Sequence, residues 1–114
     1  MNRQITTHQA LPMNALNKQL EIEAVDDAPI YNVRSPGRRL AIRFHDGDPR
    51  EGVNGVSLEA LLAICKDRLE DFRAAGLGGE HNEHAIAHIG EAMFHLHART
   101  TDRIMRGVEG SDAA

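Results

Sequence analysis

Hydrophobic and polar residues alternate in three short segments of the N-terminal half. They are residues 20–24 (Leu-Glu-Ile-Glu-Ala), residues 30–34, and residues 40–45, where Leu, Ile and Phe alternate with Ala, Arg and His. Alternation with a period of two is typical of strands with one buried face. Residues 26–29 and 35–37 carry Asp, Pro and Gly and predict turns between the strands. We therefore expect a small antiparallel sheet.

The segments on either side of this sheet have weaker patterns. Residues 1–17 are polar and interrupted by Pro12, which predicts an extended arm. Residues 46–55 are rich in Gly and Asp and predict a loop. Its last part, Gly52-Val53-Asn54-Gly55, precedes a helix, where backbone amides can hold an anion. The same residues can equally form a simple turn, and both interpretations stay open.

The apolar spacing changes to a helical period after Ser57, a residue that favours the N-cap position. We expect a first helix over residues 58–75, ended by the glycines of residues 76–79. The single cysteine, Cys65, is expected to be buried among its apolar residues. The apolar face of this helix comprises Leu58, Leu61, Leu62, Cys65, Leu69 and Phe72.

A second helix is predicted from about Glu80 to Arg106, before Gly107. Spacings of four and three residues give it a coiled-coil-like seam. At 1.5 Å per residue it is about 40 Å long, about two turns longer than the first helix. The two form an antiparallel hairpin, and we expect another subunit against the overhanging turns. The seam consists of Asn82, Ile86, Ile89, Met93, Leu96, Thr100 and Arg103.

Together these elements predict an α+β fold in one domain: a small N-terminal antiparallel sheet followed by a two-helix antiparallel hairpin. Residues 1–56 hold the arm, strands and loop, residues 57–107 the hairpin, and residues 108–114 a flexible tail. The net charge of -4 argues against a general DNA or RNA binder. One cysteine excludes an internal disulfide framework. With neither a leader pattern nor a long apolar run, we expect a soluble intracellular protein without membrane contact.

Three arginines near the end of the second helix, Arg99, Arg103 and Arg106, share one helix face. Guanidinium groups one turn apart can clamp a phosphate through paired hydrogen bonds. A solvated C-terminal turn that complements the helix dipole explains them as well, with Asp102 and Glu109 as pairing partners.

Two residues near the loop of the hairpin have similar alternatives. Phe72 can fill the core or stack on a nucleobase. Asn82 can cap the second helix or read a base or ribose edge through its amide.

The second helix also carries His84, His88, Glu91 and His95 on one face. Imidazoles four residues apart can chelate zinc, with a carboxylate completing the set. A solvated face opposite the seam is the alternative, and the HExxH sequence of zinc proteases is absent. Neither a GxSxG nor a P-loop pattern occurs, so nucleophilic catalysis has little support.

The chain resembles the phage anti-Thoeris and anti-CBASS sponge family, whose members share a helical hairpin domain. The resemblance extends over nearly the whole chain and is strongest from Ile42 to Gly110. It rests on the segments Ile5-Thr6-Thr7-His8-Gln9, Ile42-Arg43-Phe44-His45-Asp46-Gly47, Gly52-Val53-Asn54-Gly55-Val56, Leu61-Leu62-Ala63-Ile64, Arg68-Leu69, Asn82, Glu91-Ala92-Met93, Arg99-Thr100-Thr101-Asp102-Arg103 and Arg106-Gly107-Val108-Glu109-Gly110.

The resemblance implies a protein that binds glycocyclic ADP-ribose isomers intact, through Phe72, Asn82, Arg99 and Arg103 from the hairpin. Related members also bind cyclic dinucleotides and trinucleotides at separate sites between subunits, for which Thr100 and Arg106 are the candidates. It implies no catalysis and no cofactor, a homo-oligomer (dimer or hexamer), and action in the cytoplasm of the infected bacterial host. The alternatives are a metal-dependent enzyme that degrades cyclic nucleotides and a module that docks on a host protein.

Overall fold

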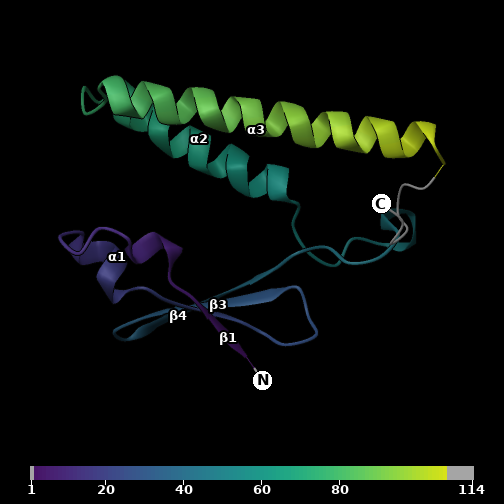
Figure 1. The fold of residues 1–114 in the computed structure, drawn as a ribbon, viewed down its shortest axis with the longest axis horizontal. Helices are drawn as coiled ribbons and strands as arrows, with labels where there is room; N and C mark the ends of the chain where they lie inside the picture. The colour runs from purple at the N-terminus through teal and green to yellow at the C-terminus, as the bar shows by residue number, and fades with distance from the viewer. Residues whose placement is uncertain (1, 108–114) are drawn as a thin grey trace. The chain divides into compact units, whose positions relative to one another are not determined.

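The computed structural model describes residues 2–107, and the prediction of a flexible tail over residues 108–114 lies outside them. Two compact units make up the chain. One comprises Met1–Asp46 with Val53–Val56, and the other comprises Gly47–Gly52 with the chain from Ser57 onward. The predicted α+β class is confirmed: an antiparallel sheet precedes two long helices (Figure 1).

The first unit is built on a four-stranded antiparallel sheet in the order β1-β2-β3-β4. Its strands are β1 (Arg3–Ile5), β2 (Glu21–Ala24), β3 (Ile30–Ser35) and β4 (Arg38–Arg43). The three predicted strands correspond to β2, β3 and β4. The predicted turn between β3 and β4 is Pro36-Gly37, where Gly37 adopts a positive φ of 75° that favours glycine.

The register gives the sheet one apolar face and one charged face. Ile22 pairs with Val33, and Val33 pairs with Leu40, so these three side chains form one cross-strand row. Ala24, Tyr31 and Ile42 form the next row on the same face. The opposite face carries Glu21, Glu23, Arg34, Arg39 and Arg43. Ala24 is the buried hydrophobic residue of this unit.

The prediction of an extended arm over residues 1–17 is wrong. Arg3–Ile5 joins the sheet as β1, with Ile5 opposite Ile22. A 3-10 turn, η1 (Thr7–Gln9), and a short helix, α1 (Ala15–Gln19), follow. The side chain of Asn14 caps α1 by accepting a hydrogen bond from the Asn17 amide at 3.0 Å. A local cap and cross-strand pairing therefore order this segment.

The loop before the hairpin contains η2 (Pro49–Glu51) and then returns to the sheet unit. Asn54 exchanges two hydrogen bonds with the backbone of Asp46, at 2.8 and 2.9 Å. A Cβ atom on Gly55 would lie 2.5 Å from the carbonyl carbon of Phe44, so only glycine allows this close approach. These contacts give residues 52–55 a turn-forming role.

The hairpin consists of α2 (Leu58–Ala74) and α3 (Glu80–Met105). Ser57 is the N-cap of α2 as predicted, accepting a hydrogen bond from the Ala60 amide at 3.0 Å. At the other end, the Leu77 amide donates to the Phe72 carbonyl and the Gly76 amide donates to the Arg73 carbonyl. With Gly76 at φ 77°, these bonds form a Schellman motif, which ends the helix.

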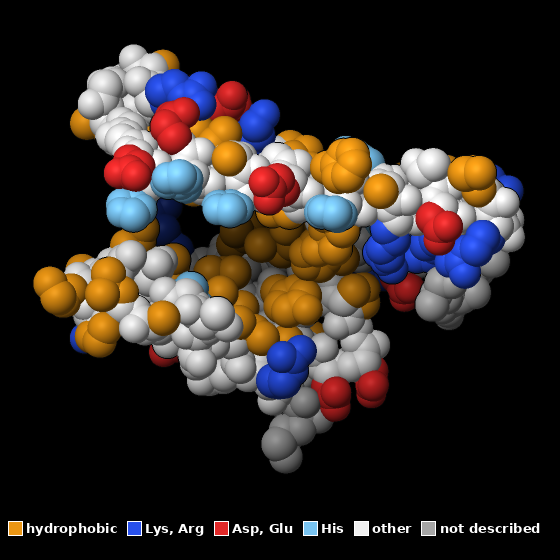
Figure 2. Space-filling view, turned by 45° about the horizontal axis from the view of Figure 1, so that its top comes forward, with side chains coloured by type: hydrophobic (Ala, Val, Ile, Leu, Met, Phe, Trp, Pro, Cys, Tyr) orange, Lys and Arg blue, Asp and Glu red, His pale blue; other side chains and the backbone are white. Residues whose placement is uncertain are grey.

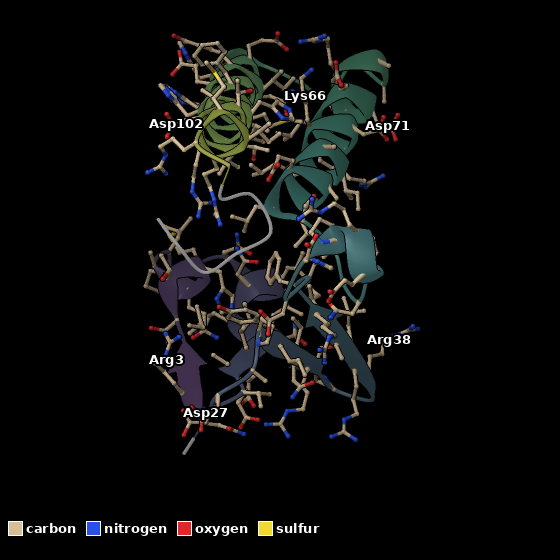
Figure 3. The ribbon with its side chains drawn as sticks, turned by 90° about the vertical axis from the view of Figure 1, so that its right-hand side faces the viewer. Arg3, Asp27, Arg38, Lys66, Asp71 and Asp102 are labelled. Carbon is tan, nitrogen blue, oxygen red and sulfur yellow. The ribbon has the colours of Figure 1, made fainter. Side chains whose placement is uncertain are left out.

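The predicted seam of α3 is confirmed, since all seven of its positions are buried or half-buried and Ile86 is buried. The inner face of α2 differs from the prediction. Cys65 and Leu58 are exposed, whereas Lys66 is half-buried. Figure 3 shows Lys66 between the two helices, with Asp71 on the outer side of α2.

Candidate functional site

Phe72 is held in the last turn of α2, where the Schellman motif fixes its carbonyl. Its side chain is 38% exposed, so the ring is only partly used in packing. The guanidinium carbon of Arg68, one turn earlier, lies 5.1 Å from the ring centroid, within the range of a cation–π interaction. One aromatic surface with a neighbouring cation therefore lies at the loop end of the hairpin.

Asn82 lies in the first turn of α3 and is half-buried. Its Nδ2 donates a hydrogen bond to the Leu69 carbonyl at 3.1 Å, which holds the side chain against α2. The structure thus places Phe72 and Asn82 at the same end of the hairpin. The two roles predicted for Asn82 were capping the second helix and binding the edge of a base or ribose. The hydrogen bond between the two helices is an additional role that neither prediction included.

An ion pair that was not predicted from the sequence also joins the two helices at this end. Arg73 Nε and Nη2 donate to Glu83 Oε2 and Oε1 at 2.9 and 2.8 Å. The hydrogen bond from Arg73 is the largest cause lowering the pKa of Glu83, and the same bond raises the pKa of Arg73. The available signal was an arginine in the last turn of one helix and a glutamate in the first turn of the next.

The three candidate arginines lie at the opposite end of α3. Arg99 and Arg106 are exposed, and Arg103 and Thr100 are half-buried. Arg106 Nε lies 3.2 Å from Asp102 Oδ2, so the predicted pairing with Asp102 is present. Lys and Arg side chains gather at this end of the long helix (Figure 2).

The two groups of candidate residues are far apart within one chain. From Asn82 to Arg99 the helix advances 17 residues, or about 25 Å. Ligand pockets usually enclose about 300–1,000 Å³, which corresponds to a sphere about 8–12 Å across. The structure therefore brings Phe72 together with Asn82, and Arg99 together with Arg103, but a single chain does not unite the two pairs.

The arginine end extends beyond the hairpin partner. α3 has 26 residues and α2 has 17, so about 14 Å of α3 lies past the start of α2 (Figure 1). The predicted overhang is thus confirmed. Exposed hydrophobic residues accompany it, including Ile104 and Met105.

A pocket of about 270 Å³ lies at this end, lined by Asp48, Pro49, Arg50, Ile104 and Gly107. All five residues belong to the hairpin unit. Arg50 was not among the sequence candidates, because its isolated position in a loop gave no spacing signal. The hydrogen bond that Arg50 donates to the Asp48 carboxylate is the largest cause raising the pKa of Arg50.

The histidine face of α3 is exposed along its length (Figure 2). His84 Nε2 lies 3.7 Å from a Glu80 oxygen, and His88 Nδ1 lies 3.7 Å from a Glu91 oxygen. Within residues 2–107, no group of three or more His, Cys, Asp or Glu residues is arranged to hold a metal ion. No helix in the same range is long and apolar enough to cross a membrane.

The architecture defines a class of small α+β proteins in which an antiparallel helical hairpin carries the candidate ligand-binding residues. Residues 36–101 match the family model described as "Acb2/Tad1, hairpin domain". The chain belongs to this family. It is also 37% identical over 76 residues to "Thoeris anti-defense 1" of Bacillus phage SBSphiJ7, an alignment that includes 66% of this chain. The chain spans only 54% of the length of that relative.

Proposed function

We propose that the protein is a phage anti-defence sponge that binds cyclic nucleotide signals, glycocyclic ADP-ribose isomers first among them, and holds them without cleavage. The family and the phage relative named for Thoeris anti-defence support this role. The observation that carries the proposal is the division of the hairpin into two ends: an aromatic and amide end, and an arginine end.

The chemistry of each end matches one part of such a ligand. The partly exposed ring of Phe72 stacks on the adenine, a contact worth about 1–3 kcal/mol per base. Asn82 keeps its Oδ1 for a base or ribose donor while its Nδ2 is bound to α2. Arg99 and Arg103 lie one turn apart and neutralise the pyrophosphate with charge-assisted hydrogen bonds. No step requires a water-activating group.

The 25 Å separation means that two chains complete one site. In a two-fold antiparallel pairing of α3 with its copy, opposite residue numbers have a constant sum. Placing Asn82 opposite Arg99 or Arg103 puts the crossing point near residues 91–92, at about the middle of the helix. Each pair of chains then forms two equivalent sites.

The test is calorimetric titration of the full chain with a panel of cyclic ADP-ribose isomers and cyclic di- and trinucleotides. The protein is then heated, and the released molecule is identified by mass. The proposal predicts tight binding, release of the unchanged ligand, and loss of binding in Arg99→Ala/Arg103→Ala. A matched control is Arg3→Ala, which removes an arginine from the sheet unit.

The outcomes separate the alternatives. Release of a linear product identifies an enzyme, and the proposal is then wrong. Absence of binding to any member of the panel also contradicts it and favours a module that docks on a host protein. Binding that survives in the double arginine variant would show that the arginine end is not part of the site.

A further inference from the structure

The pocket beside the arginine end has a lining that joins an apolar surface to a guanidinium group. Pro49 and Ile104 provide apolar atoms, and the Ile104 side chain is 59% exposed. Arg50 provides the charge. In the sequence, Arg103 directly precedes Ile104 and Arg106 directly precedes Gly107. The pocket and these two arginines therefore lie at the same end of α3.

Asp48 holds Arg50 in place at this pocket. Nε of Arg50 lies 3.1 and 3.2 Å from the two Asp48 carboxylate oxygens, and Nη2 lies 2.8 Å from Oδ2. The Asp48 carboxylate also accepts from the Arg50 amide at 2.9 Å, which fixes the loop backbone. A guanidinium has five N–H donors, so about three remain for a ligand after this fork is formed.

The two charged residues that line the pocket, Asp48 and Arg50, differ in their exposure. The side chain of Arg50 is 81% exposed and that of Asp48 is 25% exposed, so the cation is the more accessible member of the pair. The exposed group therefore presents positive charge to the pocket.

The volume decides how much of a ligand can enter. About 270 Å³ lies below the usual range of about 300–1,000 Å³ for pockets that enclose a whole ligand. The pocket thus has room for one end of a dinucleotide-sized molecule, such as a phosphate with its attached sugar. The rest of the molecule extends toward the neighbouring arginines.

We propose that Arg50 is a further ligand-binding residue: it donates to a phosphate of the captured nucleotide, the attached sugar rests on Pro49 and Ile104, and Asp48 is a positioning residue for the guanidinium. This inference rests on the proposed function, because it adds a third cation to the same site. It assigns a role to a loop residue that lies outside both helices of the hairpin.

The experiment uses calorimetric titration of the full chain with the cyclic ADP-ribose isomer that the wild-type protein binds most tightly. Arg50→Ala is expected to weaken binding by about tenfold, the effect of losing one charge-assisted hydrogen bond. It should also reduce the dependence of the dissociation constant on salt, because one ion pair with the phosphate is lost. Arg50→Lys retains the charge without the fork and should recover the salt dependence. Lys18→Ala, in the sheet unit, is the matched control.

Circular dichroism confirms that each variant is folded, as expected for changes at an exposed side chain. Arg50→Ala that binds as tightly as Lys18→Ala, with unchanged salt dependence, overturns the inference. If Arg99→Ala/Arg103→Ala loses binding in the same series, the proposed function still stands. If the wild-type chain binds no cyclic nucleotide, the proposed function fails and this inference fails with it.

Discussion

A mixing experiment provides the sharpest test of a site shared between two chains. One variant, Phe72→Ala/Asn82→Ala, removes the aromatic and amide end. The other, Arg99→Ala/Arg103→Ala, removes the arginine end. Each variant alone has no complete site of any kind. A mixed pair has one complete site, because each chain supplies the end that the other lacks.

The structure sets the expected magnitude. The two ends are about 25 Å apart along α3, so a ligand cannot contact both ends of one chain. With random exchange of chains at equal concentrations, the intact end of one variant meets the intact end of the other in about one quarter of all sites. Titration of the mixture should therefore give about one quarter of the wild-type binding capacity, with wild-type affinity at those sites.

The variants are refolded together so that their chains exchange, and binding capacity is measured by calorimetry. Mixing the folded variants without exchange is the control and should give no binding. Two outcomes refute the reasoning: zero capacity after confirmed chain exchange, or full affinity in either variant by itself. The second result would mean that one end of a single chain suffices.

Four further predictions concern the hairpin and the loop before it. Gly90→Ala should stabilise the fold by about 0.5–1 kcal/mol, measured by thermal melting, because a Cβ atom at this helix position would meet nothing within 4 Å in its own chain. Gly55→Ala should lower the melting temperature sharply, because its Cβ would lie 2.5 Å from backbone; an unchanged melting temperature would contradict the contact. Ser57→Ala should cost about 1 kcal/mol in chemical denaturation through loss of the N-cap. The pKa of Glu83 is lowered in the folded protein, so its ion pair with Arg73 stabilises the fold at pH values above the ordinary carboxyl pKa of about 4.3. This stabilisation is lost as the pH falls through the pKa of Glu83 in the folded state. In Arg73→Gln, the free energy of unfolding, measured by denaturation at a series of acidic pH values, should therefore depend less on pH.

The long elements could be predicted because their periodicity extends over many residues. All seven seam positions of α3 are buried or half-buried, since a mismatch in period over 26 residues would turn apolar side chains into solvent. The face of α2 was harder to predict. Cys65 and Lys66 are adjacent in the sequence, so a small rotation of the helix decides which of them faces α3. Hydropathy favours the cysteine, but the long aliphatic stem of a lysine can also lie against an apolar surface.

The elements that depend on distant partners could not be predicted. β1 has three residues, and its pairing with β2 depends on a register set by Ile5 and Ile22, which are 17 positions apart. The candidate ligand residues were found from helical spacing and a family resemblance. Arg50 was not found, because only the folded loop brings it to a pocket with Ile104.

The unequal lengths of the two helices have a consequence for dose. If each chain carries only half of a site at either end of α3, the number of working sites rises with the square of the chain concentration until the chains are fully associated. A few copies made at the start of expression would then leave the signal untouched, whereas a modest further rise in synthesis would remove it abruptly. The overhang of one helix would thus set a threshold in time for the host response.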